Sequence, residues 1–152
     1  RVYQFVYRVV RDGEDAADIT QETFIRAYGK LKGFRGDSTL FTWLYRIALN
    51  MSINCLRKKK LRSFIPLWES AEHELWAQGG PEEDLAASRL RSRLEEAIDG
   101  LPARQRSIFV LRQYDQLSHR EIAEVVGSSE GAVRAGYFHA LRKLRGALRD
   151  CL

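Results

Sequence analysis

One stretch of the sequence places nucleic-acid-binding side chains at helical spacing. On an α-helix, with 100° between successive residues, an aromatic ring, two asparagines and two arginines recur every three or four residues and share one stripe. Amides can read base edges, a guanidinium can bind phosphate, and an aromatic ring can stack on an unpaired base at roughly 1–3 kcal/mol. The stripe consists of Trp43, Arg46, Asn50, Asn54 and Arg57. This pattern predicts contact with a nucleic-acid strand.

The remainder of this helix is mostly apolar, so we expect it to be largely buried, with only a narrow polar stripe. The adjoining apolar face is formed by Leu40, Leu44, Ile47, Met51 and Cys55. A basic run over 57–62 follows, and it would attract a phosphate backbone. The alternative is an amphipathic core helix with a basic tail, which Trp43 taken alone favours.

A second candidate site is the segment LSHREIAEVVGSSEGAVRAGYFHALRKLR, which has the pattern of a helix-turn-helix. Ser118 is a good N-cap, and Glu121 three residues later completes a capping box. Gly127 supplies the tight turn, and Ser128 or Ser129 then caps a second helix.

The second helix of this motif is amphipathic and basic. Its core-facing side is predicted to be Val133, Tyr137, Leu141, Leu144 and Leu148. In a DNA-binding helix-turn-helix this helix enters the major groove, where its first turns touch bases and its basic residues touch phosphates. The exposed candidates are Ser129, Arg134, Ala135, Phe138, His139 and Arg142. A plain helical hairpin is the alternative, and the basic character of the helix favours DNA binding.

No constellation for catalysis or metal binding is present. His73, His119 and His139 have no ligand spacing to another histidine or cysteine, and no Ser/His/Asp or Cys/His arrangement can be argued. We therefore expect no metal, cofactor, catalytic residue or small-molecule substrate. Cys55 and Cys151 cannot form a disulfide framework, so a reducing compartment is the simplest assumption. Cys55 is expected to be inert core.

The elements that must position these residues are helices. Helical periodicity covers about 1–11, 14–31, 39–60, 82–99, 104–114, 119–126 and 129–149. Between them, Pro66, Gly79, Gly80 and Pro81 mark a linker. We therefore predict an all-α chain of two small helical domains joined by a flexible linker, with the helix-turn-helix in the C-terminal domain. The predicted boundaries are 1–62, 63–81 and 82–152.

Composition and charge agree with this reading. The chain has 152 residues and a net charge of +5, and it lacks an apolar run long enough to span a membrane. The net charge is +7 over 1–64, −6 over 65–100 and +4 over 101–152. Two basic blocks suit nucleic acid. We expect a soluble, cytoplasmic protein without membrane insertion, and the apolar stretch at Arg1 indicates that the natural start is missing.

Two long segments resemble a known family. The segment DAADITQETFIRAYGKLKGFRGDSTLFTWLYRIALNMSINCLRKKK is similar to the second conserved region of bacterial RNA polymerase sigma factors of the extracytoplasmic-function (ECF) type. The segment LPARQRSIFVLRQYDQLSHREIAEVVGSSEGAVRAGYFHALRKLR resembles their fourth conserved region. The two segments cover most of the chain in the family's order, so the match is highly specific.

The resemblance implies a protein that binds core RNA polymerase and directs it to promoter DNA, without a catalytic site of its own. It implies polymerase contacts by Asp15, Asp18, Gln21, Glu22, Phe24 and Ile25. It implies recognition and melting of the minus-ten element by Phe34, Arg35, Ser38, Thr39, Trp43, Arg46, Asn50, Asn54, Arg57 and Lys58. Phe34 and Asn50 are the best candidates for holding a flipped base.

The resemblance also implies that the C-terminal domain reads the minus-thirty-five element and that an anti-sigma factor masks the chain. Gly136, His139 and Leu141 stand where the family commonly has arginine, so the minus-thirty-five sequence cannot be inherited from other members. A stand-alone helix-turn-helix regulator, binding a palindrome as a dimer, is the alternative function.

Overall fold

The computed structural model describes residues 1–63 and 85–149, and every regular element in these ranges is a helix. In chain order they are α1 (Val2–Val10), α2 (Gly13–Lys30), the short 3₁₀ helix η1 (Leu31–Gly33), α3 (Leu40–Ser63), α4 (Leu85–Asp99), α5 (Ala103–Gln113), α6 (His119–Val126) and α7 (Glu130–Leu148). The predicted all-α fold is confirmed. The predicted linker after Ser63, together with His73 and Cys151, lies outside the described residues.

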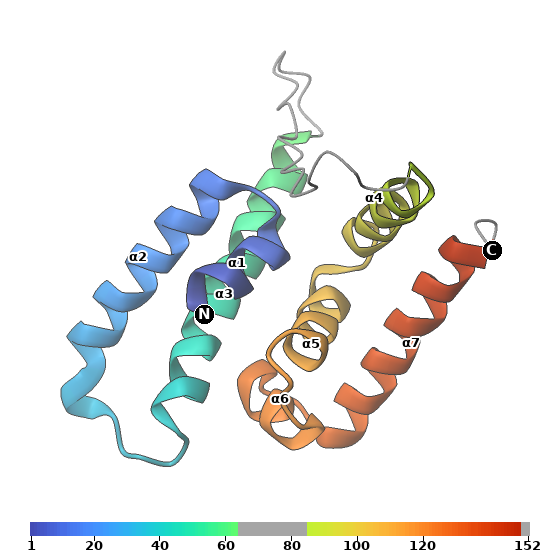
Figure 1. Ribbon diagram of the computed structural model, residues 1–152. Helices are drawn as coiled ribbons and strands as arrows, with labels where there is room; N and C mark the ends of the chain where they lie inside the picture. The colour runs from blue at the N-terminus through green and yellow to red at the C-terminus, as the bar shows by residue number, and fades with distance from the viewer. Residues whose placement is uncertain (64–84, 150–152) are drawn as a thin grey trace.

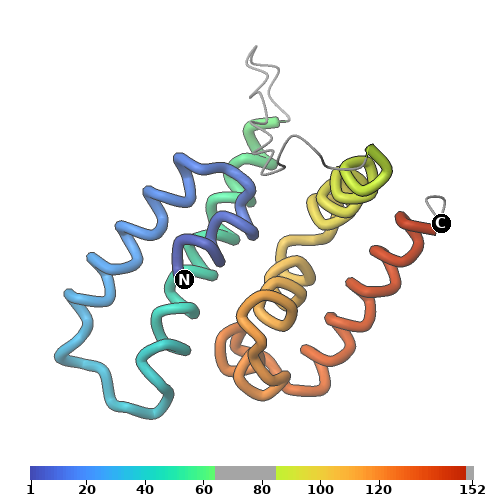
Figure 2. The backbone as a smooth tube through the Cα atoms, viewed as in Figure 1, coloured from blue at the N-terminus to red at the C-terminus, as the bar shows by residue number. Residues whose placement is uncertain are grey.

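Helices α1 to α3 form one half of the molecule and α4 to α7 form the other (Figure 1). Helices α5 and α6 lie between α1–α3 and α7, so α7 is on the outer side of its half (Figures 1 and 2). None of the described helices is long and apolar enough to cross a lipid bilayer.

Side-chain caps begin several of the described helices. Asp12 accepts a hydrogen bond from the backbone N–H of Asp15 at 3.0 Å and starts α2. Ser118 and Glu121 form the predicted capping box of α6, and Ser129 caps α7. Each cap satisfies backbone donors that the first turn of a helix leaves without a partner, so the chain enters these helices at defined residues.

The N-terminal half is packed around the apolar face of α1. Phe5, Val6 and Val9 are completely buried, and the ring of Phe5 lies 4.9 Å from the ring of Tyr45 in α3. Ile19 of α2 closes the same cluster. Because α1 contributes so much of this core, it fixes how α2 and α3 lie relative to each other.

The C-terminal half buries Leu111 of α5, Ile122 and Val125 of α6, and Val133 of α7. A second cluster beside it consists of Ile98, Leu101, Phe109, Ala140 and Leu144. These side chains hold the helix-turn-helix against α4 and α5. The predicted core-facing residues Val133 and Leu144 are confirmed as buried.

The two helical halves also share a core. Phe5 and Tyr45 belong to the same cluster of buried side chains as Leu111 and Ile122. The two domains predicted from the sequence are therefore in direct contact, an arrangement that the residue spacing did not indicate.

Arg106 of α5 lies at this contact and is 8% exposed. Its guanidinium donates to the backbone carbonyls of Val9 at 2.7 Å, Ile98 at 3.2 Å and Leu101 at 3.3 Å, and also to that of Asp99. Burial lowers the pKa of Arg106 below its ordinary value. The carbonyls at the C-terminal ends of α1 and α4 carry partial negative charge, so they offset the cost of burying the cation.

We expect Arg106→Met to lower the free energy of unfolding by about 2–4 kcal/mol, because hydrogen bonds from a charged donor contribute roughly 1.5–3 kcal/mol each. Urea unfolding followed by circular dichroism measures this. The matched control is Arg104→Met on the same helix, since Arg104 is exposed and makes one long bond of 3.4 Å to the carbonyl of Val126. Equal losses in the two variants would contradict the structural role of Arg106.

Candidate functional site

The polar stripe predicted on α3 lies at the surface. Asn50, Asn54 and Arg57 are exposed, and Trp43 is half-buried at the start of the stripe. The buried side of the helix consists of Thr42, Tyr45, Ala48, Leu49 and Ser52. Helix α3 is therefore turned so that its amides and its arginine face outward, as the spacing indicated.

The loop before α3 brings two predicted residues together. The rings of Phe34 and Trp43 lie 5.0 Å apart at an angle of 39°. Asn50 lies two turns beyond Trp43 on α3, roughly 10 Å from it along the helix axis at about 1.5 Å per residue. Arg35 is exposed and Ser38 is half-buried. The aromatic pair thus offers a stacking surface beside the start of the stripe.

Thr39 has a structural task in addition to the predicted one. Its hydroxyl oxygen accepts a hydrogen bond from the backbone N–H of Thr42 at 3.1 Å and lies 2.9 Å from the hydroxyl of Thr42. A threonine in this position satisfies an unpaired donor of the first turn and so fixes the start of α3.

The basic run at the end of α3 is divided between two tasks. Lys58 is exposed, whereas Lys59 forms ion pairs with Asp12, at 3.1 Å, and with Asp15. Burial alone lowers the pKa of Lys59, but hydrogen bonds to the two carboxylates outweigh burial and raise it. The thiol of Cys55 lies 3.5 Å from the carboxylate of Asp15. Burial raises the pKa of the Cys55 thiol, so this side chain has little thiolate character.

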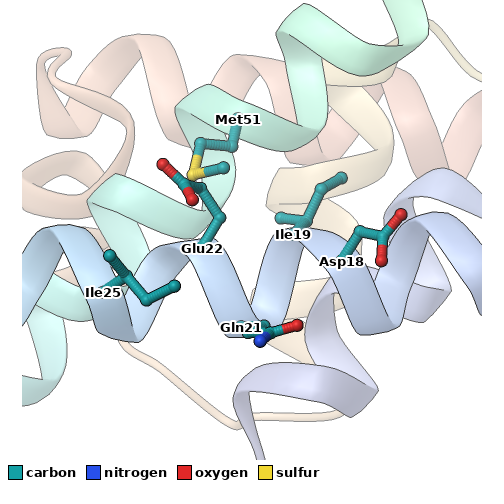
Figure 3. A pocket seen from close by; sticks show the side chains of 6 residues that line it. All are labelled: Asp18, Ile19, Gln21, Glu22, Ile25 and Met51. Atoms are coloured by element: carbon teal, nitrogen blue, oxygen red, sulfur yellow. The ribbon is translucent and has the colours of Figure 1, made fainter.

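The residues predicted to bind polymerase do not all lie together. Asp15 points to the end of α3, where it pairs with Lys59. A hollow of about 470 Å³ between α2 and α3 collects most of the others (Figure 3). It is lined by Asp18, Ile19, Gln21, Glu22, Ile25 and Met51. Glu22 also pairs with Arg26 at 2.8 Å, one turn further along α2.

An exposed apolar strip continues from this hollow along α2 to the start of η1. Phe24 is 51% exposed, Ile25 57%, Tyr28 83% and Leu31 50%. Sequence reasoning included Phe24 and Ile25 and missed Tyr28 and Leu31. The signal was present as a spacing of four from Phe24 to Tyr28 and of three from Tyr28 to Leu31, but periodicity alone cannot distinguish a face that packs in the core from one left uncovered. An uncovered apolar strip of this kind is typical of a protein-binding surface.

The helix-turn-helix has the predicted local geometry. Gly127 adopts the left-handed backbone conformation with φ of 64° and ends α6, and Ser129 accepts a bond from a backbone N–H at 3.1 Å as the cap of α7. The outward-facing residues of α7 are Arg134, Ala135, Phe138, His139 and Arg142. Phe138 is 61% exposed. Because α7 is on the outer side, this face is available to a DNA groove.

Two side chains on this face have further neighbours. Arg134 pairs with Glu130 at 3.0 Å within α7. His139 and Arg142 line a hollow together with Gln105 and Lys143. Sequence reasoning did not connect Gln105 to this face, because it comes from α5 and meets α7 only in the folded chain.

The glycine in the middle of α7 has a packing explanation. A Cβ added at Gly136 would lie 2.9 Å from Cδ1 of Ile108, a buried side chain of α5. Glycine costs about 1 kcal/mol of helix propensity, and here it lets α7 approach α5 closely. A larger side chain at this position, arginine included, would have to displace Cδ1 of Ile108.

The remaining stripe residue, Arg46, contacts the other half of the molecule. Its Nε and Nη2 atoms both donate to the backbone carbonyl of Glu124 in α6, with Nε at 3.0 Å. Arg46 thus lies on the predicted face of α3, with its guanidinium bound to protein. Within residues 1–63 and 85–149, no group of three or more metal-ligating side chains lies close enough to hold a metal ion.

Comparison with known proteins agrees with this geometry. Residues 1–62 match the family Sigma-70 region 2, and residues 91–144 match Sigma-70, region 4. The RNA polymerase sigma-H factor of Pseudomonas aeruginosa is 34% identical over 100% of this chain and 82% of its own length. The ECF RNA polymerase sigma factor SigW of Bacillus subtilis is 33% identical over 99% of this chain and 84% of its own length.

The fold has a relative among solved structures. The sigma factor RpoE of Bartonella quintana, in complex with the anti-sigma factor NepR, superposes with a TM-score of 0.75 at 23% identity. The superposition covers 97% of this chain and 89% of that one. The chain belongs to the sigma factors of bacterial RNA polymerase, and within them to the ECF type. Its role is in the initiation of transcription.

Proposed function

We propose that this chain binds core RNA polymerase through α2, melts and holds the minus-ten element with α3, and reads the minus-thirty-five element with α7. In this proposal residues 1–62 are the polymerase-binding and melting domain, 82–152 are the minus-thirty-five domain, and 63–81 link them. The observation that carries it is the exposed stripe of amides and basic residues on α3 beside the Phe34–Trp43 pair.

The proposed mechanism at the minus-ten element is strand separation without chemistry. Unstacking costs about 1.4 kcal/mol per base-pair step, so opening a few pairs costs several kcal/mol. Stacking of a base on an aromatic ring returns roughly 1–3 kcal/mol, which Phe34 and Trp43 can supply. Asn50 and Asn54 would hold exposed bases by hydrogen bonds, and Arg57 and Lys58 would bind the backbone. Sigma factors in general are not catalytic, and we propose no catalytic site or cofactor.

At the minus-thirty-five element the exposed face of α7 would enter the major groove. Arg134 and Arg142 can donate to base edges or phosphates, and Ala135 and Phe138 can contact thymine methyl groups. The hollow lined by His139 would lie against the sugar-phosphate backbone of the DNA. Ser129 would bring the N-terminal end of the helix, with its partial positive charge, near a phosphate.

The proposal also includes an anti-sigma partner and a place of action in the cell. An anti-sigma factor would mask the uncovered strip of α2, by analogy with the complex in which the RpoE relative was solved. The site of action would be the cytoplasm, where polymerase and promoter DNA are found.

We expect the purified chain with core polymerase to give transcripts from cognate promoters, identified by sequencing the DNA that the complex retrieves. Gel filtration and a core-polymerase pull-down test the alternative. A stand-alone regulator would form a dimer that binds a palindrome tightly without polymerase. Failure to bind core polymerase would overturn the proposal.

We expect Asn50→Ala to reduce formation of open complexes on a cognate promoter about 10-fold, because the lost amide contacts are worth roughly 1–3 kcal/mol. Binding to closed duplex should change less than 2-fold, since Asn50 would meet its base only after the strands separate. Permanganate reactivity of unpaired thymines measures opening, and Gln4→Ala, an exposed amide on α1, is the control. Equal effects on opening and duplex binding would argue against this role.

We expect Tyr28→Ala to weaken binding to core polymerase about 10-fold, because an exposed tyrosine in an uncovered apolar strip is a typical interface anchor. The control is Tyr3→Ala on α1, where the ring is 43% exposed and lies 6.3 Å from Tyr7. Titrating labelled polymerase with each variant gives the dissociation constants of Tyr28→Ala and Tyr3→Ala. An unchanged affinity for Tyr28→Ala would restrict the polymerase site to the earlier turns of α2.

A further inference from the structure

Met51 is the only methionine in the sequence, and its side chain lines the hollow between α2 and α3. It comes from α3 and points toward α2, where Ile19, Glu22 and Ile25 line the facing side (Figure 3). Met51 packs against the core cluster and is half-buried. A thioether that solvent still reaches therefore forms part of the surface of this hollow.

A buried hydroxyl lies next to the sulfur of Met51. Oγ1 of Thr23 is 3.8 Å from Sδ, and Thr23 is completely buried. The same hydroxyl donates to the backbone carbonyl of Ile19 at 2.7 Å, which is the stronger bond because a thioether is a weak acceptor. An oxygen atom added to the sulfur would be a much stronger acceptor. Thr23 has one hydroxyl proton, so it could serve that oxygen only by giving up its bond to Ile19.

Among the residues that the structure describes, the other sulfur atom belongs to Cys55, one turn further along α3. Peroxides attack cysteine as the thiolate, and the half-buried Cys55 beside the carboxylate of Asp15 has little thiolate. Oxidation of a methionine needs no deprotonation, so its rate depends on access to the sulfur. Met51 is therefore the sulfur of α3 that is open to oxidation.

We propose that Met51 is a reversible oxidation site that controls binding to polymerase: a peroxide converts it to the sulfoxide, and the sulfoxide weakens the contact made at the hollow. A lone pair of the sulfur forms a bond to one peroxide oxygen, the O–O bond breaks, and the other oxygen leaves as water with both hydrogens. The sulfur loses two electrons and the peroxide gains them. Methionine sulfoxide reductases restore the thioether. The inference rests on the proposed function of α2 as the polymerase-binding helix.

The sulfoxide weakens binding because a partner seated on α2 removes water from the hollow. Met51, Ile19 and Ile25 provide apolar surface there, and covering apolar surface favours association. In the free chain water solvates the sulfoxide oxygen, but under a bound partner that oxygen is left without a donor. The nearby carboxylates of Asp18 and Glu22 are acceptors, so they cannot satisfy it.

Titration of labelled core polymerase with the full chain, before and after oxidation, tests the site. The free chain is treated with hydrogen peroxide, the peroxide is removed, and mass spectrometry of the peptide containing Met51 detects the added oxygen. We expect the oxidised wild type to bind about 10-fold more weakly than the untreated chain. Methionine sulfoxide reductases should restore the affinity, whereas dithiothreitol, which reverses cysteine disulfides and sulfenic acids, should not.

Three variants separate oxidation of Met51 from damage elsewhere. Met51→Leu keeps an apolar side chain of similar size without sulfur, so its own affinity should be the same before and after peroxide. Met51→Gln places a permanent polar group in the hollow and should bind about 10-fold more weakly than the untreated wild type, with or without peroxide. Ile53→Gln changes a half-buried position of α3 outside the hollow, so it should weaken binding less than about 2-fold and keep the response to peroxide.

Polymerase should also protect the site. When the complex is treated with hydrogen peroxide, Met51 should be oxidised about 5-fold more slowly than in the free chain, because oxidation follows exposure of the sulfur. Equal rates in the free chain and the complex would show that the partner does not cover Met51, which would overturn the inference.

The inference is also overturned by equal affinities of the untreated and oxidised wild type, or by a response of Met51→Leu as large as that of the wild type. Loss of the helical circular-dichroism signal on oxidation would overturn it as well, because the loss of binding would then be unfolding. An untreated wild type that fails to bind polymerase refutes the proposed function and the inference with it. An untreated chain that binds, with an oxidised chain that binds equally well, refutes the inference alone.

Discussion

The guanidinium of Arg106 is the interaction on which the arrangement of this protein depends. It is a buried cation whose hydrogen bonds go to backbone carbonyls at the ends of α1 and α4. Carbonyls at the end of a helix lack donors within that helix, although that of Ile98 also accepts from the backbone N–H of Leu101 at 3.0 Å. The five N–H groups of one guanidinium can serve several such carbonyls. Helix α1 packs against α3, and α5 packs against the helix-turn-helix. The bonds from Arg106 of α5 to the end of α1 therefore help to fix the position of α3 relative to α7.

Helix α3 shows how one element serves both stability and function. Tyr45, Ala48 and Leu49 bury one side of it, and Asn50 and Asn54 project from the other. Tyr45 is shared between the two halves, since its ring packs on Phe5 and its hydroxyl reaches Asp115. The buried side holds α3 rigid, so the exposed amides have fixed positions before a DNA strand binds. Binding then does not have to spend free energy on ordering these side chains.

Several predicted site residues also have structural tasks that their type alone did not reveal. Asp15 pairs with Lys59, Thr39 caps α3, and Arg46 donates to the carbonyl of Glu124. Conversely, Tyr28 of α2 and Leu31 of η1 extend the uncovered strip, which residue type and spacing did not distinguish from a side that packs in the core. For Asp15, Arg46, Tyr28 and Leu31, the deciding fact is whether the folded chain brings a group from another helix close to the side chain.

The sequence by itself determined the local structure of this protein. Helical periodicity, the capping box of Ser118 and Glu121, and the left-handed turn at Gly127 depend on residues a few positions apart, so they can be read from neighbouring letters. The tertiary structure alone decided the contact between the halves. The bonds of Arg106 to Val9, Arg46 to Glu124 and Tyr45 to Asp115 join residues 97, 78 and 70 positions apart. Their existence depends on the packing of whole helices, and no local pattern carries that information.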